Sequence, residues 1–438
     1  AEQGFAISPR LHSLLESDPV IRKSPDMAAY FLNRDGSVKA VGTRLQNPAL
    51  AAVLKRIANE GPDALYKGPI AEEIVAKVQG HANPGSLSLN DLQRYQAKER
   101  APLCTDYKRW QVCGMPPPSS GGIAVAQILG TLQALETRDP RLSLTPLKPH
   151  KTDKPAGIEP DPQAVHLIAE AERLAYADRD KYVADTDFIP LPANGVSSMI
   201  DKTYLKQRAA LINADGKSMG TAAAGDLGSV PLGVDKTVEK GTTHFSIVDA
   251  YGNVVSMTST VESSMGSYHM VGGFLLTNQL TDFSAQPADT AGVPVANRVA
   301  PGKRPRSTMA PTLVFKGTAP GDFVMATGSP GGGTIIQYVL KTVVGALDWG
   351  LDAQQATSLV NIGATNSATT NVDGANTALD LTALIDGLKA KGHTVNNGAQ
   401  SSGVSTIMRV QRSGGATLEL EGGVDPRREG IVLGDGAL

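Results

Sequence analysis

The sequence predicts a protein of the α+β class, in which helical and extended segments alternate without internal repeats. Two strand-like runs, residues 243–248 and 254–260, are separated by a polar, glycine-containing loop, which is the pattern of a β-hairpin. Residues 164–182 place apolar side chains at helical spacing on one face. Residues 324–347 have the pattern of a strand, a glycine loop and an apolar helix. With 438 residues, the chain can bury a large core.

Charge and hydropathy exclude two classes of partner. The 41 basic and 43 acidic side chains give a net charge of −2, and no run of Lys or Arg indicates a nucleic-acid surface. No apolar stretch reaches the roughly 18 residues needed to span a bilayer. The first five residues, AEQGF, show neither an initiator Met nor a signal-peptide pattern, so we expect a processed or truncated start.

The first hundred residues carry a helix signal, and a candidate disulfide follows them. Ser88 and Asp91 have the spacing of a helix cap. A two-residue turn at positions 108 and 109 would place Cys104 opposite Cys113, where a disulfide can form. Because this turn lacks the Asn-Gly signal, two unrelated reduced cysteines are the alternative. We favour the disulfide, which indicates an exported protein, periplasmic or secreted.

The segments between the cysteines and the hairpin are predicted to be a mixture of loops and one helix. Residues 115–122, MPPPSSGG, cannot form regular structure and are either a proline-stiffened connector or a loop that lines a pocket. An apolar helix is expected over 123–135, and residues 139–162 have the composition of a surface insertion. Residues 216–240 are polar and glycine-rich, which predicts a flexible approach to the first hairpin strand.

The hairpin register raises the question of what its hydroxyl groups do. If residues 249–253 form the loop, His244 faces Thr258, and Thr242 faces Thr260. Two hydroxyl groups would then meet at the open end of the hairpin. Threonine is also simply a good strand residue, and a bulge would shift this register.

The glycine loop at 328–333 does not have the spacing of a phosphate loop, because no Gly-Lys-Ser/Thr closes it. Backbone N–H groups before a helix are nevertheless suited to stabilising a developing negative charge. Glycines that merely allow a tight turn are the alternative. The sequence predicts no cofactor and no metal, since the seven histidines include no pair at ligand spacing and the two cysteines are too few. His244 is expected to support or orient its neighbours.

Five motifs in order resemble the γ-glutamyltransferase family: MPPPSSGG, TTHFSIVD, NQLTDFS, PGKRPRSTMAPT and TGSPGGGT. The resemblance extends from near residue 1 to about residue 430. It implies the four-layer αββα fold of N-terminal nucleophile hydrolases and a precursor that cuts itself between Gly241 and Thr242. Residues 1–241 would form a large-subunit portion, apparently without the family's N-terminal stretch, and 242–438 a small-subunit portion. The two portions would be intertwined in one globular unit and associate as a heterodimer.

The resemblance also implies roles for individual residues. Thr242 would be the nucleophile, with its own new α-amino group as the base, and Thr260 would bind and orient its hydroxyl. The remaining implied residues are Gly331 and Gly332 in the oxyanion hole, Asp282 with Gln279 for the substrate ammonium, and Ser307 with Thr308 for the substrate α-carboxylate.

Three departures from the family pattern affect the expected function. Glu262 stands where many members have asparagine, and it adds a second negative charge that would favour the substrate ammonium or another cationic donor. The loop 285–299 has no aromatic residue, and the family's carboxylate-binding arginine lies in a more N-terminal stretch. We expect a γ-glutamyl hydrolase or transferase that uses glutathione-like donors and passes the acyl group to water, an amino acid or a peptide. A cephalosporin or glutaryl amidase of the same fold, and a truncated, unprocessed and inactive member, are the alternatives.

Overall fold

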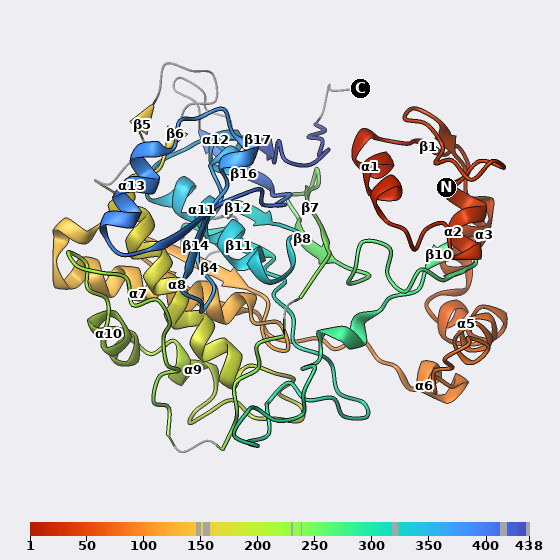
Figure 1. The fold of residues 1–438 in the computed structure, drawn as a ribbon, viewed down its shortest axis with the longest axis horizontal. Helices are drawn as coiled ribbons and strands as arrows, with labels where there is room; N and C mark the ends of the chain where they lie inside the picture. The colour runs from red at the N-terminus through yellow and green to blue at the C-terminus, as the bar shows by residue number, and fades with distance from the viewer. Residues whose placement is uncertain are drawn as a thin grey trace. The chain divides into compact units, whose positions relative to one another are not determined.

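The computed structural model describes residues 1–145, 150–151, 158–228, 231–237, 239–317, 323–411 and 418–434 (Figure 1). The chain divides into two compact units. The first contains residues 1–100 and 261–279, and the second contains residues 101–260 and 280–438. Both sides of the expected cut between Gly241 and Thr242 therefore belong to the second unit. The division into a large and a small portion concerns chain cleavage and stays a prediction.

Three helices of the first unit begin where a polar cap precedes proline. Ser8, Ser24 and Asn47 each accept a backbone N–H from the first turn, and the following proline needs no acceptor there. The predicted cap at Ser88 is confirmed as a capping box with Asp91. The elements of this unit are β1 (Phe5–Ala6), α1 (Pro9–Ser17), α2 (Pro25–Phe31), β2 (Arg44–Leu45), α3 (Pro48–Glu60), α4 (Asp63–Tyr66), α5 (Pro69–Gln79), α6 (Leu89–Arg94), β9 (Met270–Val271) and β10 (Phe274–Leu275).

A six-stranded antiparallel sheet forms the centre of the second unit. Its strands in spatial order are β17 (Leu418–Val424), β16 (Ser405–Gln411), β12 (Phe323–Gly328), β11 (Thr312–Phe315), β4 (Trp110–Gly114) and β3 (Leu103–Tyr107). The predicted turn at positions 108 and 109 joins β3 to β4, and Cys104 faces Cys113 in the register. The two cysteines form a disulfide with an S–S distance of 2.00 Å, which confirms that prediction.

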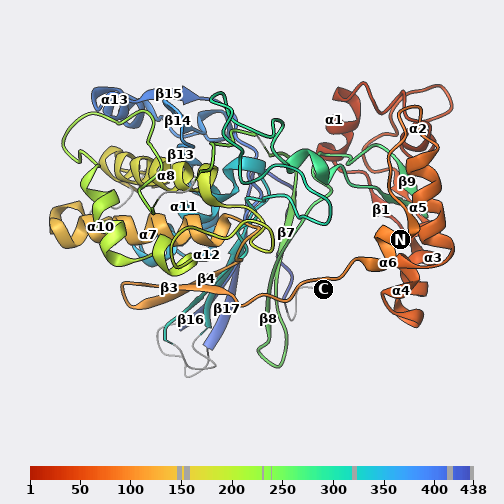
Figure 2. The ribbon, with the colours of Figure 1, turned by 90° about the horizontal axis from the view of Figure 1, so that it is seen from below.

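Three long helices cover one face of this sheet, as Figure 2 shows: α7 (Gly121–Arg138), α8 (Pro162–Tyr182) and α11 (Ile335–Leu347). The helix predicted over 164–182 is confirmed as α8. Buried residues surround almost the whole helix, because α7 and α13 (Thr382–Ala390) pack against it. Its buried residues include five charged side chains: Glu170, Glu172, Arg173, Asp178 and Arg179. These charges require buried partners.

The remaining elements of the second unit are short. They are η1 (Pro140–Leu142), β5 (His150–Lys151), β6 (Ile158–Glu159), α9 (Val196–Met199), α10 (Lys202–Ala210), η2 (Gln279–Asp282), η3 (Gly332–Thr334), α12 (Ala353–Ser358), β13 (Ile362–Gly363), β14 (Thr369–Val372), η4 (Gly374–Asn376) and β15 (Thr394–Asn397). η2 begins at the last residue of the first unit. Much of the expected surface insertion, residues 146–149 and 152–157, lies outside the described residues. Across the described ranges, none of the helices has the length and apolar character of a membrane-crossing segment.

The predicted hairpin consists of β7 (Thr243–Val248) and β8 (Val254–Ser259), and its register is confirmed, with His244 opposite Thr258. One face packs on β12 and β16 of the six-stranded sheet. The other face exposes four apolar side chains to between 40% and 51%: Phe245, Ile247, Val255 and Met257. In the described part of the second unit, helices, sheet and hairpin thus form three of the four expected layers, and the outer face of the hairpin has no helical cover.

Candidate active site

Two threonine hydroxyls converge on one carbonyl group at the open end of the hairpin. The Thr260 hydroxyl donates to the carbonyl oxygen of Gly241 at 3.0 Å, and the Thr242 hydroxyl contacts the same oxygen. Regular pairing stops one residue earlier, at Thr243 opposite Ser259. The two threonines thus meet at this end of the hairpin, where Thr260 binds the carbonyl that precedes Thr242. The expected role of Thr260 in orienting the Thr242 hydroxyl stays a prediction. A donor there polarises the Gly241–Thr242 peptide bond.

His244 lies on the inner face of the hairpin and supports it. Its Nδ1 is 2.8 Å from the Thr258 hydroxyl, and its Nε2 is 3.2 Å from the Ser246 hydroxyl. Burial lowers the pKa of His244 to about 4, so the ring is neutral at physiological pH. The ring packs against Gly328, where an added Cβ would come within 2.2 Å of it. These contacts agree with the expected supporting role.

The glycine loop lies against the chain that precedes Thr242. Gly331 and Gly332 have φ values of 144° and 59°, and a Cβ on Gly332 would lie 2.3 Å from the carbonyl oxygen of Glu239. The N–H of Gly333 donates to that same carbonyl oxygen at 3.3 Å. Tyr176 on α8 donates to the Gly333 carbonyl at 2.6 Å. The loop is therefore held by α8 on one side and contacts the segment before Thr242.

A buried charged cluster surrounds the carboxylate of Glu239, three residues before Thr242. Arg179 forms an ion pair with this carboxylate, and Arg306 Nε lies 3.7 Å from it. Although burial opposes it, the carboxylates of Glu239 and Asp180 raise the pKa of Arg179. Arg306 also pairs with Asp235, with 3.1 Å between Nη2 and the carboxylate oxygen.

The predicted carboxylate-binding hydroxyls lie beside this cluster. The Thr308 hydroxyl is 2.7 Å from the Glu239 carboxylate and 2.7 Å from the carbonyl oxygen of Gly332. Ser307 binds the loop 115–122 through its backbone, since its carbonyl oxygen accepts the N–H of Ser120 at 2.7 Å. The Ser120 hydroxyl in turn accepts Nε–H of Arg179 at 2.9 Å. Ser120 therefore contacts this cluster from the segment before α7. Gly121 and Gly122, which were expected to be irregular, are the first two residues of α7.

Asp282 lies near the same cluster. Asp282 is 5% exposed. Its backbone carbonyl oxygen accepts a hydrogen bond from the side-chain amide of Asn297 at 2.8 Å. The Asn297 amide also donates to the Asp235 carboxylate at 3.0 Å. Asp282 is thus one residue removed from the pair that Asp235 forms with Arg306.

Glu262 and Gln279 belong to the first unit. Glu262 is 3% exposed and accepts the side-chain amide of Asn278. The backbone N–H of Gln279 donates to the hydroxyl of Thr277 at 3.1 Å. Their expected roles in reading a substrate ammonium stay predictions.

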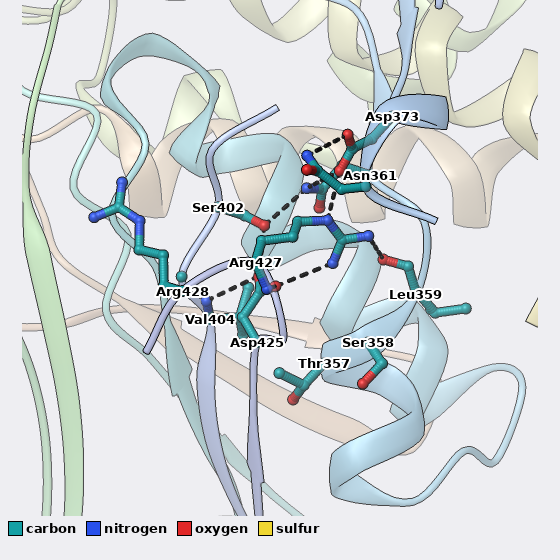
Figure 3. Close-up of polar contacts among 12 residues, drawn as sticks. Thr357, Ser358, Leu359, Asn361, Asp373, Ser402, Val404, Asp425, Arg427 and Arg428 are labelled. Atoms are coloured by element: carbon teal, nitrogen blue, oxygen red, sulfur yellow. Dashed lines mark hydrogen bonds and ion pairs between the residues drawn. The ribbon is translucent and has the colours of Figure 1, made fainter. Parts of the chain in front are cut away.

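Arg428 was not identified from the sequence, although it contacts the candidate nucleophile. Its Nη1 donates to the carbonyl oxygen of Thr242 at 3.3 Å, across 186 positions of sequence. Figure 3 shows that the neighbouring Arg427 points the opposite way. Arg427 is held by Asp373, by Asp425 at 3.1 Å and by the carbonyl oxygen of Leu359 at 3.0 Å. This buried network fixes the backbone from which Arg428 extends. The only local signal was a pair of adjacent arginines.

A second polar group brings together residues that the sequence showed no reason to connect. Nδ1 of His166 and Nε2 of His393 are 2.8 Å apart, and Glu170 lies beside them. His166 Nε2 donates to the carbonyl of Asn213, so its Nδ1 accepts from His393, whose Nδ1 accepts the Thr370 hydroxyl. Glu170 is occupied by other donors, including Arg173 at 2.8 Å. These three possible metal ligands therefore already have protein partners, and both histidines are neutral.

We expect this histidine pair to make the fold acid-sensitive. Burial lowers the pKa of His393 to about 3, with smaller contributions from the adjacent His166 and from the charges of Arg173 and Lys391, and burial also lowers the pKa of His166. Above the unfolded pKa of about 6.5 the ring is neutral in both states and has no effect on stability. As the pH falls below that value, the unfolded chain binds a proton that the folded protein does not, so the free energy of unfolding decreases. At pH 5, His393 alone should cost about 2 kcal/mol of unfolding free energy relative to pH 7.

Denaturant unfolding at pH 7 and pH 5 measures this effect. The variant His393→Gln removes the titrating group and should lose about 2 kcal/mol less than the wild type over that interval. Equal losses in both proteins would show that His393 does not sense pH.

The layers of helices, sheet and hairpin are those of the N-terminal nucleophile hydrolase fold. A solved cephalosporin acylase from Bacillus halodurans has this fold, with a TM-score of 0.74 and 21% identity over 97% of this chain and 70% of that chain. A family model described as Gamma-glutamyltranspeptidase matches residues 1–435, and the chain belongs to that family.

Curated relatives carry two kinds of name. A glutathione hydrolase proenzyme of Escherichia coli is 36% identical over 371 residues, which cover 82% of this chain and 58% of the relative. The Bacillus subtilis glutathione hydrolase proenzyme is 35% identical, covering 81% of this chain and 57% of its own length. An acylase ACY 1 proenzyme of Pseudomonas sp. (strain SE83) is 32% identical, with coverage of 81% and 57%. The chain thus spans just over half the length of these relatives.

Proposed function

We propose that the chain is the catalytic part of a self-processing γ-glutamyl hydrolase or transferase whose nucleophile is Thr242. The observation that carries this proposal is the convergence of the Thr242 and Thr260 hydroxyls on the Gly241 carbonyl oxygen. Membership of the gamma-glutamyltranspeptidase family supports the choice of reaction, and two relatives named glutathione hydrolase proenzyme support the substrate class.

The first reaction breaks the chain. The Thr242 hydroxyl oxygen attacks the Gly241 carbonyl carbon, and the negative charge that develops on the carbonyl oxygen is stabilised by the Thr260 hydroxyl. The C–N bond then breaks, and the proton from the hydroxyl passes to the released nitrogen, which becomes the α-amine of Thr242. Water hydrolyses the resulting ester, so that Gly241 ends in a carboxylate and the Thr242 hydroxyl is restored.

The second reaction is turnover. The α-amine of Thr242 takes the proton of its own hydroxyl as the oxygen attacks the γ-carbonyl carbon of the donor. The N–H groups of Gly331 and Gly332 are proposed donors to the oxyanion, each contributing on the order of 3 kcal/mol. The leaving amine departs with a proton, and water or the amine of an amino acid or peptide then takes the acyl group from Thr242. The two pieces of the chain remain associated as a heterodimer in this proposal.

The donor is proposed to carry a free ammonium and a carboxylate, as glutathione does. Asp282 is the proposed ammonium ligand, and Ser307 and Thr308 are the proposed carboxylate ligands. The disulfide between Cys104 and Cys113 supports a periplasmic or secreted location, because such bonds persist in oxidising compartments.

Donor discrimination tests this function. In Asp282→Asn, a charge-assisted hydrogen bond worth about 2 kcal/mol is lost, so kcat/KM for a γ-glutamyl anilide should fall roughly thirtyfold. A glutaryl anilide has the same length but no ammonium, and its turnover should change little. Equal losses with the two donors would mean that Asp282 supports the fold and does not bind substrate.

The turnover of the two anilides by the wild-type protein separates the alternative functions. Preference for the γ-glutamyl anilide supports the proposed function. The family's acylase branch, to which the ACY 1 relative points, predicts preference for the glutaryl anilide. No turnover of either donor by a cleaved protein would contradict both.

A further inference from the structure

The carboxylate of Glu239 is bound in the way that an enzyme binds a free carboxylate ligand. It pairs with Arg179, lies 2.7 Å from the Thr308 hydroxyl and 3.7 Å from Arg306 Nε. Glu239 is 6% exposed, and Thr308 and Arg306 are each 1% exposed. Guanidinium groups with a hydroxyl are the donors that carboxylates prefer.

The Glu239 carboxylate does not satisfy all of the hydrogen-bond donors that surround it. Among the described residues, the buried Nε of Arg306 has no hydrogen-bond partner. It faces the Glu239 carboxylate at a distance too long for a hydrogen bond. A buried N–H without an acceptor is costly, so a carboxylate closer to Arg306 Nε would be bound better than Glu239 is.

Glu239 also belongs to the segment that the proposed cleavage would release. It lies three residues before Thr242, and its own carbonyl oxygen accepts the N–H of Gly333 in the glycine loop. Glu239 therefore binds two sets of donors at once. Its side chain pairs with Arg179, and its backbone carbonyl accepts a hydrogen bond from the glycine loop. Lys240, the next residue, is exposed.

We propose that Glu239 is a built-in substitute for a ligand carboxylate, which occupies the carboxylate pocket of Arg179, Arg306 and Thr308 until the chain is cut. The inference rests on the proposed function for the event that releases the segment. After the Gly241–Thr242 bond breaks, the segment ending at Gly241 leaves, and the α-carboxylate of an amino-acid-like ligand replaces Glu239. Arg179 and Arg306 thereby supply the guanidinium groups for that carboxylate from within this chain.

The position of Asp282 agrees with an amino-acid-like ligand. Asn297 joins its carbonyl oxygen to the Asp235 carboxylate, which pairs with Arg306. The backbone of Asp282 and the guanidinium of Arg306 are thus joined through two side chains, Asn297 and Asp235. A molecule that carries an ammonium and a carboxylate on one carbon has the matching chemistry.

The test uses the uncut chain, so it does not depend on turnover. In the background Thr242→Ala, the further change Glu239→Ala removes the substitute and leaves a space that acetate can fill. Calorimetric titration with acetate and with glutarate should show binding at least about tenfold tighter than to Thr242→Ala alone. Adding Thr308→Val should weaken this binding again. A folded Glu239→Ala protein that binds neither anion, or a parent that binds as tightly, would overturn the proposal.

Glu170→Ala is the matched control, because Glu170 is also buried and bonded to an arginine, at 2.8 Å from Arg173. It should gain no acetate binding. If Glu239→Ala does not fold, Glu239→Gln keeps the volume and removes the charge. Trypsin should then cut after Lys240 at least about tenfold faster than in the parent, with no such change in Glu170→Gln. An unchanged rate would show that the carboxylate does not hold the segment.

The two proposals fail separately. Loss of anion binding in a protein that still cuts itself and turns over substrate removes only the role of Glu239. An uncut wild-type chain whose Glu239→Ala variant binds acetate removes the nucleophile assignment and leaves the carboxylate pocket intact.

Discussion

Replacing Thr242 by alanine is expected to leave the chain uncut and to abolish turnover. The hydroxyl of Thr242 contacts the Gly241 carbonyl, and alanine has no oxygen that can attack it. The α-amine that serves as the base in turnover would also never form. Gel electrophoresis of the purified variant should show one chain of residues 1–438, and a γ-glutamyl anilide assay should give no signal above the buffer.

Two matched variants control for damage to the hairpin. Thr242→Ser keeps the hydroxyl and should still be cut. Thr243→Ala removes the adjacent hydroxyl, whose residue is exposed at the start of β7, and should also be cut. Cleavage of Thr242→Ala at the same bond, or an equal loss in Thr243→Ala, would exclude Thr242 as the nucleophile.

Removing the Thr260 hydroxyl should give the second largest effect. Its donation to the Gly241 carbonyl oxygen at 3.0 Å places it where negative charge develops during chain cleavage. Loss of one such donor typically lowers a rate by about 10²–10³-fold. In Thr260→Val, which keeps the shape of the side chain, the rate at which a new Thr242 terminus appears should fall by that factor.

Thr258→Val is the control for this substitution. Thr258 lies two residues earlier on the same side of β8, and its hydroxyl binds His244 at 2.8 Å. It should slow cleavage far less than Thr260→Val. If Thr260→Val cuts itself at nearly the wild-type rate, the Thr260 hydroxyl does not stabilise the oxyanion.

Local patterns predicted the parts of the fold that depend on neighbours in sequence. The registers that place His244 opposite Thr258 and Cys104 opposite Cys113 followed from the lengths of two turns. The helix start at Ser88 followed from its cap. The motifs also pointed to Thr242 and Thr260, which meet at the carbonyl of Gly241, and their roles in the reaction stay predictions.

Contacts between distant segments could not be predicted in this way. Nothing near Arg428 in sequence indicates that it reaches the carbonyl of Thr242, and nothing near His166 indicates His393. The periodicity of α8 shows which side is apolar, but not that other helices bury its charged side as well. The pairing of Arg179 with Glu239 depends on that burial. Charge pairs of this kind are set by tertiary packing, which a single sequence does not display.

The N-terminal sequence and the masses of the purified wild-type protein after incubation test the role of Thr242 most directly. We predict two pieces, residues 1–241 and residues 242–438, the second beginning Thr-Thr-His. A single uncut chain after prolonged incubation, or a break at any other bond, would contradict the assignment of Thr242 as the nucleophile.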